Sequence, residues 1–382
     1  MPEAVIVSAL RTPVGTAGRG TLRDTTAFDL AHHIVGAAAK GLDPDRVDDV
    51  ILGEGLYGGG VIARHAALTV GLTSVPGLAF NRHCAAGLAA VAGAAAGIRA
   101  GMDELIIAGG VNSASTAPKS RFRIDGEWAE PWMPPTHPDR PDAPNADMSL
   151  CIGWNVAQRA GISRADMDAW ALRSHRNAVR AIDEGRFDAE LVPIETPYGL
   201  FSVDEHPRRD TSLEKLAALK PLHPEIEGFS ITAGNACGGN DGAAALVVAR
   251  EETAAAEGLP ALATVRAWAS VGVDPAETGL SPVKAIPKAL ARAGLTTSDV
   301  DLYEINEAFA SVTVAAVRLL GLDPDTVNVN GSGCSLGHPV AATGARMLVT
   351  LVHELRRRGG GIGVASMCAG GGMGSAMVVE VS

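Results

Sequence analysis

The sequence predicts an α/β protein built from two similar units. Short apolar strands at residues 78–81 and 105–108 flank a long helical stretch rich in alanine and glycine. A similar arrangement recurs near the C-terminus, where predicted strands at 327–330 and 362–365 flank a second small-residue helix. Apolar strands that alternate with helices are typical of parallel sheets covered by helices. The predicted fold class is therefore a duplicated α/β fold.

A weak internal repeat supports the duplication. Residues 41–54 and 294–307 each follow an alanine-rich stretch, and Gly, Leu, Val, Asp and a final Glu recur in register. Both copies continue through a helix to a short strand that ends in asparagine, at Asn81 and Asn330. Such segments also recur by chance in α/β proteins, but the matching positions favour duplication. A ligand would then lie at the carboxyl ends of strands, near helix N-termini.

Between the two units the chain changes character. Residues 116–147 contain seven prolines together with Trp128 and Trp132, which excludes a regular helix or a central strand. We expect a packed, functional loop there, followed by a helix from Ser163 to about residue 182. The predicted domains are an N-terminal half (1–115 plus 239–260), an inserted loop domain that covers a ligand (116–238) and a C-terminal half (261–382).

Composition and charge exclude several classes of protein. With 382 residues, 47% of them hydrophobic, the chain can bury a sizeable core. A formal net charge of −11 argues against nucleic acid as the main partner, because phosphate binding requires a basic surface. The longest apolar stretch, residues 84–98, is mostly alanine and glycine and predicts a core helix, not a membrane span. With no targeting signal recognised, we expect a cytoplasmic protein.

The cysteines are predicted to be free thiols. Their number is odd and none forms a C-x-x-C pair, so neither a disulfide framework nor a zinc ribbon is favoured. The five residues are Cys84, Cys151, Cys237, Cys334 and Cys368.

Three glycine-rich segments carry reactive side chains. Cys84 follows a predicted strand and opens a helix, whose N-terminus would stabilise a thiolate. His338 precedes Pro339, which fits the first turn of a small-residue helix. This corner is the repeat equivalent of the Cys84 corner, so both would face one cleft. Cys368 begins a run of glycines whose backbone N–H groups are free to face a ligand oxygen. A core thiol, a packed histidine and a tight turn are the structural alternatives, and for Cys84 alone the two explanations are evenly balanced.

Asn306 and Glu307 follow the strand of the second repeat. They either cap the next helix or orient a water and the imidazole. Taken alone, capping is the favoured interpretation.

Together these segments resemble the thiolase family, acyl-CoA C-acetyltransferases that form or cleave 3-oxoacyl-CoA. The resemblance runs over nearly the whole chain, with the segments in the family's order. It implies a layered α-β-α-β-α fold with an inserted loop domain over the CoA site. The segments are 8–13, 81–87, 204–209, 232–236, 240–243, 306–310, 337–339, 342–346 and 368–374.

The resemblance also implies a role for each catalytic residue. Cys84 would be the nucleophile that becomes acylated, and His338 would remove its proton. Cys368 would act as acid and base toward the leaving acetyl-CoA carbanion or the incoming CoA. Asn306 would hold a water that forms one oxyanion hole with His338, and the backbone N–H groups of Cys84 and Gly370 would form the other.

CoA is implied as co-substrate, with no redox or metal cofactor. The partners would be CoA and acyl-CoA thioesters, and the assembly a homodimer or homotetramer. The implied CoA contacts are Arg208 on the nucleotide side and Ala233, Cys237, Ala308 and Phe309 on the pantetheine side.

The chain departs from the family pattern around the acyl pocket. Cys237 stands where members usually have serine, and a thiol hydrogen-bonds more weakly than a hydroxyl. Residues 148–150 replace a His-Met-Gly stretch of biosynthetic members, His223 replaces a frequent aromatic, and residues 331–335 replace Gly-Gly-Ala-Ile-Ala. We therefore expect degradative thiolysis, of the kind used in fatty acid β-oxidation, in preference to acetoacetyl-CoA synthesis.

Three rival functions stay open at this point. A decarboxylating or hydroxymethylglutaryl-type condensing enzyme would lack a thiol at Cys368. A non-catalytic acyl-CoA or lipid-binding protein would not need the three reactive side chains. A cysteine hydrolase would release free acid without added CoA.

Overall fold

One mixed sheet runs through the computed structural model, which describes residues 2–55, 57, 60–132 and 135–382. Its strands lie in the order β12-β13-β14-β11-β1-β10-β5-β3-β4, and β2 pairs with β10. The bounds are β1 (Ala4–Arg11), β2 (Gly15–Thr16), β3 (Asp49–Gly53), β4 (Gly77–Phe80), β5 (Leu105–Ser113), β10 (Asn240–Arg250), β11 (Ala263–Gly272), β12 (Leu302–Ile305), β13 (Gly361–Ala369) and β14 (Met373–Val381).

The sheet has two halves that meet at β1 and β11. These strands pair through Val5–Thr264 and Ile6–Ala263. In the first half β3 pairs in parallel with both β4 and β5, and in the second half β12 pairs in parallel with β13. Each half therefore contains the parallel strand pairing that βα repeats produce.

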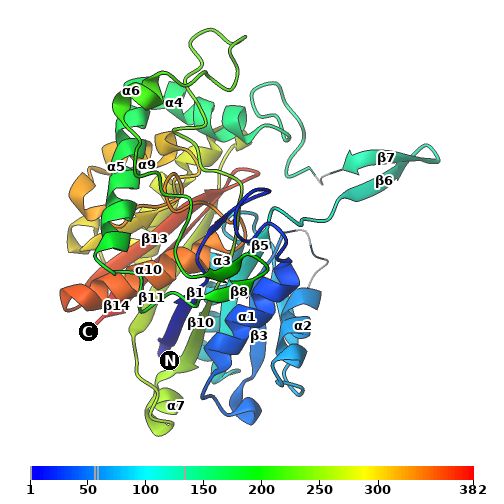
Figure 1. Ribbon diagram of the computed structural model, residues 1–382. Helices are drawn as coiled ribbons and strands as arrows, with labels where there is room; N and C mark the ends of the chain where they lie inside the picture. Colours follow the sequence, from blue (N-terminus) through cyan, green and yellow to red (C-terminus); the bar gives the residue numbers. More distant parts are fainter. Residues whose placement is uncertain (1, 56, 58–59, 133–134) are drawn as a thin grey trace.

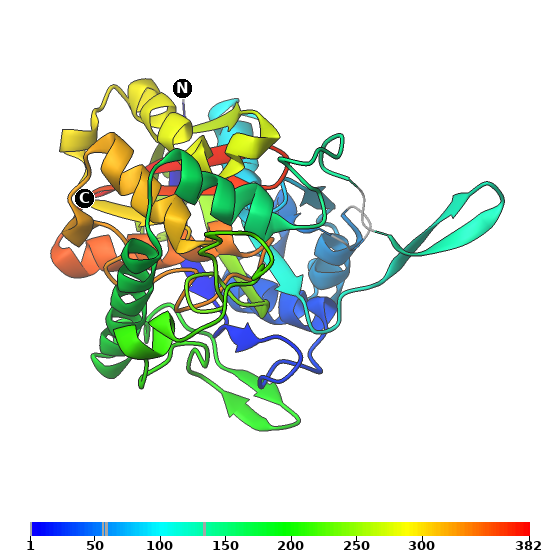
Figure 2. The same ribbon diagram turned by 90° about the horizontal axis from the view of Figure 1, so that it is seen from above.

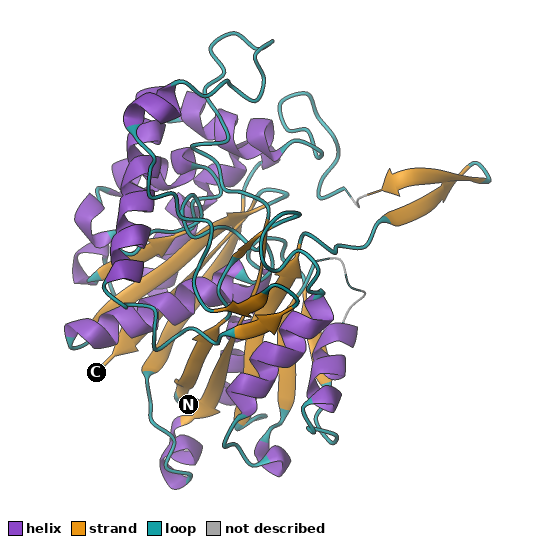
Figure 3. Ribbon diagram, viewed as in Figure 1, coloured by secondary structure: helices purple, strands orange, loops and turns teal. Residues whose placement is uncertain are grey.

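Helices form three layers around the two halves of the sheet (Figures 1 and 3). Helices α3 (Ala86–Arg99) and α10 (Thr343–Arg358) lie between the halves: α3 contacts β5 and β14, and α10 contacts β13 and β10. On the outer faces, α1 (Ala27–Ala39) and α2 (Val61–Thr69) cover the first half, and α8 (Ser281–Ala293), with α9 (Ala310–Leu320) beside it, covers the second. This confirms the predicted α/β class and the α-β-α-β-α layering.

Small residues allow the two central helices to cross closely. A Cβ atom on Gly344 of α10 would lie 2.4 Å from the backbone nitrogen of Leu88. A Cβ on Gly87 of α3 would lie 2.8 Å from the carbonyl oxygen of Ala341. The alanine and glycine content therefore brings the N-terminal ends of α3 and α10 together.

Part of the proline-rich segment forms a hairpin, which the sequence reasoning missed. Strands β6 (Ser120–Ile124) and β7 (Glu127–Trp132) extend away from the body (Figure 2). The turn uses Asp125 at φ +49° and Gly126 at φ +91°, a conformation that favours a two-residue hairpin. The expected packing is wrong for Trp128, which is 64% exposed, and the side chain of Trp132 lies outside the described ones.

The rest of the insertion packs on both halves: Ile152 and Trp170 join the core of the C-terminal half, whereas Ile194 and Phe201 join that of the first half. Its predicted helix is confirmed: Ser163 caps α5 and forms a capping box with Asp166. The remaining elements of the insertion and linkers are η2 (Ser149–Trp154, a π-helix), α4 (Asn155–Arg159), α5 (Arg164–Asp183), β8 (Ile194–Thr196), β9 (Gly199–Phe201), α6 (Leu213–Ala217), α7 (Glu251–Ala256) and the short 3₁₀ helices η1 (Pro44–Arg46), η3 (Pro275–Leu280), η4 (Thr297–Asp299) and η5 (Pro324–Thr326).

The strand predicted at residues 327–330 is wrong. Val327 makes one isolated parallel bridge to Tyr303, and Asn328 then turns to φ +50°. The Asn328 side chain makes the hydrogen bonds that a paired strand would make with the backbone of Ile305. Its Oδ1 accepts from the Ile305 N–H, and its Nδ2 donates to the Ile305 carbonyl, each at 2.8 Å. An amide side chain thus completes the edge where a backbone strand was expected.

No helix in the described ranges is both long enough and apolar enough to span a membrane.

Candidate active site

Cys84 lies at the corner between β4 and α3. The preceding residue, His83, has φ +46°, a strained conformation for a residue with a side chain, and its N–H donates to Asn81 Oδ1 at 3.0 Å. Helix α3 begins two residues after Cys84, and no side chain caps its first turn. The half-buried thiol is therefore held beside a helix N-terminus whose N–H groups favour negative charge.

Backbone donors reach the sulfur of Cys84. Burial raises the pKa of Cys84 to about 11, while hydrogen bonds from the backbone of Gly370 and of Cys84 itself oppose the rise. These two N–H groups are the pair expected to form an oxyanion hole. The resting thiol is neutral near pH 7, and an anion that forms beside it would find donors already in place.

Cys368 lies inside β13, one residue before its end, opposite Gly374 of β14. It is fully buried, and its pKa is raised by burial and then by the nearby thiols of Cys84 and Cys237. The glycines that follow turn the chain into β14, with Gly371 at φ +85°. The glycine run therefore forms a tight turn between the two strands. It also supplies the backbone N–H of Gly370, which donates to the Cys84 sulfur.

His338 lies at the equivalent corner of the C-terminal half. Its side chain is buried, and its backbone N–H donates to Asn240 Oδ1 at 2.9 Å. The ring Nδ1 lies 2.6 Å from Oγ1 of Thr343. Burial, and then the charge of Arg346, lower the pKa of His338 to about 3, so the imidazole is neutral. Pro339 was expected in the first helical turn, but α10 begins at Thr343 and Pro339 lies in the turn before it.

Asn306 lies against the face of this imidazole. Its Nδ2 is 3.5 Å from Nδ1 and 3.4 Å from Nε2 of His338, nearly equidistant, which places the amide off the ring plane. Its Oδ1 is buried and has no hydrogen-bond partner among the described residues. An unpaired buried acceptor is costly, so this oxygen is available to a ligand or a water.

Capping by Asn306 or Glu307, favoured from the sequence alone, is wrong. Helix α9 begins at Ala310, and no side chain donates or accepts a cap hydrogen bond there. Glu307 is instead buried and fixes the loop that carries Asn306. Its carboxylate accepts hydrogen bonds from Trp170 Nε1 (2.8 Å), Ser174 Oγ (2.6 Å), Asn328 Nδ2 (2.8 Å) and the Cys334 N–H (3.1 Å).

The residues expected beside pantetheine form two adjacent segments. The Cys237 N–H donates to the Ala308 carbonyl at 2.9 Å, and Ala236 forms a bridge with Phe309. Ala233 is exposed, whereas the side chains of Ala308 and Phe309 are buried. The latter two would therefore meet a ligand mainly through the surface that their backbone forms.

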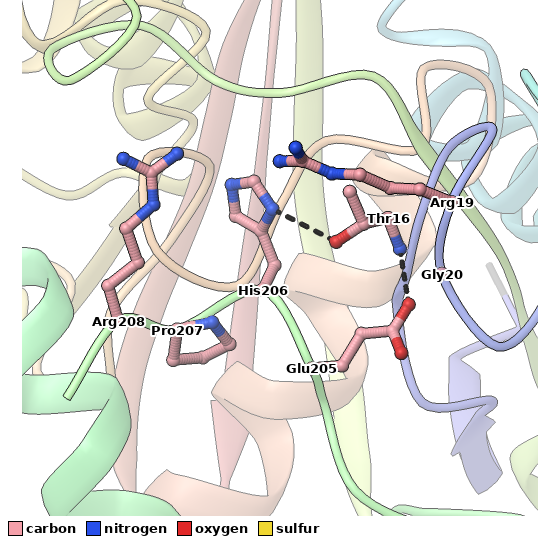
Figure 4. A pocket seen from close by; sticks show the side chains of 7 residues that line it. All are labelled: Thr16, Arg19, Gly20, Glu205, His206, Pro207 and Arg208. Carbon is pink, nitrogen blue, oxygen red and sulfur yellow. Dashed lines mark hydrogen bonds between the residues drawn. The ribbon is translucent and has the colours of Figure 1, made fainter.

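Arg208 lies apart from the thiols, on a separate pocket of about 340 Å³ (Figure 4). Figure 4 shows Arg19 and Arg208 on either side of His206. Burial, and then both arginines, lower the pKa of His206 to about 4. A Cβ on Gly238 would lie 2.7 Å from the His206 ring, so this pocket adjoins the Cys237 segment. Its lining is Thr16, Arg19, Gly20, Glu205, His206, Pro207 and Arg208.

Sequence reasoning missed three residues that shape the site. They are His83, which sets the backbone before the thiol, Asn240, which holds the backbone N–H of His338, and Thr343, which contacts its imidazole. Asn240 and Thr343 fall inside segments already singled out, but nothing in the sequence showed that they contact His338. Within the described ranges, no cluster of His, Cys, Asp or Glu is arranged to hold a metal ion.

These groups have the chemistry of covalent acyl transfer. A thiol with backbone donors aimed at it can carry an acyl group. A second thiol nearby adds a proton donor and acceptor to the same site.

Comparisons with known proteins agree. The family model "Thiolase, N-terminal domain" matches residues 4–252, and "Thiolase, C-terminal domain" matches residues 259–381. The chain is 42% identical to the acetyl-CoA acetyltransferase of Escherichia coli K12, covering 100% of this chain and 99% of that protein. It is 39% identical to the 3-ketoacyl-CoA thiolase of Bacillus subtilis 168, covering 100% of each.

A solved structure shares the fold over the whole chain. Human mitochondrial 3-ketoacyl-CoA thiolase in complex with CoA has a TM-score of 0.90 and 35% identity, and the match covers 100% of this chain and 98% of that one. The protein is thus an acyltransferase, and the chain belongs to the thiolase family.

Proposed function

We propose that this thiolase cleaves 3-oxoacyl-CoA with CoA through an acyl-Cys84 intermediate. The observation that carries the proposal is the convergence of the Gly370 and Cys84 N–H groups on the Cys84 sulfur, beside Cys368. The relatives named 3-ketoacyl-CoA thiolase and the CoA-bound structural neighbour support CoA-dependent chemistry. Arrangement and relatives therefore favour the same reaction class.

The first half-reaction would acylate the enzyme. As the Cys84 sulfur attacks the 3-oxo carbon, its proton passes to His338, and the oxygen of the tetrahedral adduct gains negative charge beside the N–H groups. The bond between C2 and C3 then breaks with its electron pair on C2. Cys368 gives its proton to this carbanion, which leaves as acetyl-CoA. Cys84 keeps the shortened acyl group.

The second half-reaction would return the enzyme to its resting state. The Cys368 thiolate takes the thiol proton of an incoming CoA, and the CoA sulfur attacks the acyl carbon on Cys84. The bond from that carbon to the Cys84 sulfur breaks, and His338 returns its proton to the sulfur. Each residue thus ends in its starting protonation state, and no redox or metal cofactor is needed.

Asn306 would act beside His338. Its unpartnered, buried Oδ1 supports the proposal that a water binds there and, with the imidazole, stabilises the enolate oxygen of acetyl-CoA. We place CoA along Ala308, Phe309, Ala233 and Cys237 toward Arg208. The positive surroundings of His206 support an anionic nucleotide at that end.

The degradative direction is the preferred proposal, and synthesis of acetoacetyl-CoA is the second candidate. Residues 148–150, which depart from the biosynthetic pattern, support the first candidate: the sulfur of Met148 lies 3.9 Å from the Cβ position of Gly370, whose backbone donates to Cys84. The 42% identity to an acetyl-CoA acetyltransferase favours the second candidate.

The decisive experiment compares kcat/KM for CoA-dependent cleavage of acetoacetyl-CoA with that of longer and branched 3-oxoacyl-CoAs. We expect longer substrates to react at least as well as acetoacetyl-CoA. Reaction with acetoacetyl-CoA alone would establish the second candidate instead.

We also propose a homodimer or homotetramer in the cytoplasm. Strand β4 is an edge of the sheet, and Leu78 on it is 44% exposed. An exposed strand edge pairs readily with another chain, and Leu68 on the adjacent α2 is also exposed. The molar mass in solution, measured by light scattering, tests the assembly.

A further inference from the structure

Thr343 forms a short hydrogen-bonded relay with His338. It is fully buried and is the first residue of α10. Its Oγ1 lies 2.9 Å from the carbonyl oxygen of Pro339 and 2.6 Å from Nδ1 of His338. Both contacts are within hydrogen-bond distance, and each requires a proton between its two heavy atoms.

The contact with Pro339 has one possible direction. A carbonyl oxygen only accepts, so in this contact the hydroxyl of Thr343 donates its single proton to Pro339, whose carbonyl also accepts from the N–H groups of Ala342 and Thr343. With that proton used, Oγ1 can only accept from the ring. The proton of the 2.6 Å contact therefore belongs to Nδ1 of His338.

We propose that Thr343 is a positioning residue that holds His338 as the Nδ1–H tautomer and so leaves Nε2 as the proton acceptor. This inference rests on the proposed role of His338 as the base toward Cys84. A neutral imidazole carries one ring proton, and the other nitrogen carries the lone pair that acts as base. Thr343 thereby decides which ring nitrogen is basic, although it touches no reacting atom.

Neighbouring residues hold His338 and Thr343 in place. The N–H of His338 is fixed by Asn240, and the crossing with α3 leaves no room for a Cβ at the next residue, Gly344. The lowered pKa of His338 agrees with a neutral ring.

The test compares Thr343→Val, which keeps the shape and removes the hydroxyl, with Thr343→Ser, which keeps the hydroxyl. Rapid-quench mass spectrometry measures the rate at which acetoacetyl-CoA acylates Cys84. We expect Thr343→Val to lower that rate about 100-fold or more, as loss of a correctly oriented base does, with little change in KM. Thr343→Ser should stay within about threefold of the wild type.

Thr350→Val is the matched control, because it removes another buried hydroxyl from the same helix. Thr350 donates to Glu190, away from the thiols. It should cost stability and leave the acylation rate within about twofold. If Thr343→Val and Thr350→Val slow acylation equally, the hydroxyl of Thr343 is merely structural and the inference is wrong.

A spectroscopic readout does not depend on activity. In protein labelled with ¹⁵N-histidine, the His338 signals, identified by their loss in His338→Asn, should show a protonated Nδ1 and a bare Nε2. Thr343→Val should lose this preference. A protonated Nε2 in the wild type would overturn the inference even if acylation proceeds, whereas a wild type that never becomes acylated would overturn the proposed function itself.

Discussion

The two strand-to-helix corners of the duplicated fold differ in how many side-chain contacts hold the reactive residue. At the first corner, Cys84 is half-buried, follows a strained residue and meets backbone N–H groups that no side chain caps. At the second, His338 is buried, and its N–H, Nδ1 and ring face all contact side chains. At the Cys84 corner the backbone N–H groups thus stay free to bind substrate. At the His338 corner the imidazole is held by side chains before substrate binds.

The difference follows from what each corner must do. A nucleophile needs donors that become fully used only when an oxyanion forms, so side-chain caps there would compete with substrate. A base needs a fixed tautomer and orientation before substrate arrives. Duplication supplies two similar corners, and the side chains that pack on each decide its role.

Removing the nucleophile should produce the largest effect. Cys84→Ala is expected to lower kcat for thiolysis by 10⁴-fold or more, because no acyl-enzyme can form. The matched control is Cys151→Ala, which removes a buried thiol whose hydrogen bond goes to the Pro275 carbonyl. It should lose some stability and keep its activity.

Cys368→Ala separates the two thiols further. It should still allow slow acylation of Cys84 by acetyl-CoA, which needs no carbon–carbon cleavage, but block cleavage and formation of the carbon–carbon bond, since the carbanion then lacks its acid. Equal loss of acylation in Cys84→Ala and Cys368→Ala would contradict the division of labour.

The close crossing that joins the corners should tolerate no added atom. In Gly344→Ala the new Cβ would lie 2.4 Å from the Leu88 backbone nitrogen, and we expect the free energy of unfolding to fall by about 3 kcal/mol. Gly272→Ala is the control, since nothing lies within 4 Å of its Cβ position. It should change stability by no more than about 0.5 kcal/mol in denaturant titration. Equal denaturation midpoints for the two variants would show that the crossing of α3 and α10 can accommodate the added methyl group.

The protonation state of the Cys84 thiol should make its reactivity change gradually with pH, a smaller effect than those above. Because burial raises the pKa of Cys84 to about 11, the thiolate fraction should rise with pH throughout the neutral range. Alkylation of Cys84 by iodoacetamide, followed by peptide mass spectrometry, should accelerate about tenfold per pH unit from about pH 7 to 9. A rate that is flat between about pH 6 and 8 would indicate a resting thiolate–imidazolium pair, and the comparison of the corners would fail.

Much of the fold follows from local patterns in the sequence. The alternation of strands with small-residue helices predicted the duplicated α/β class, and Ser163 with Asp166 marked the start of α5. The strand at 327–330 could not be excluded from the sequence, because the side chain of Asn328 replaces the ladder and only the fold shows that. The Asp125–Gly126 turn was a readable hairpin signal, which the surrounding prolines obscured.

The site was predictable where function depends on local backbone. Cys84, His338 and Cys368 lie beside glycines or helix starts, and those features are visible in the sequence. The contacts of His338 were not, since Asn240 is 98 residues away and folding alone brings the two together. Glu307 was misread for the same reason: its donors come from three other segments of the chain.

The most direct test of the account is the mass of the enzyme after incubation with acetoacetyl-CoA in the absence of free CoA. We predict one acetyl group on Cys84, absent from Cys84→Ala and removed as acetyl-CoA when CoA is added. No adduct, an adduct on another cysteine, or release of free acetate without CoA would contradict the assignment of Cys84 as the acyl carrier of a thiolase.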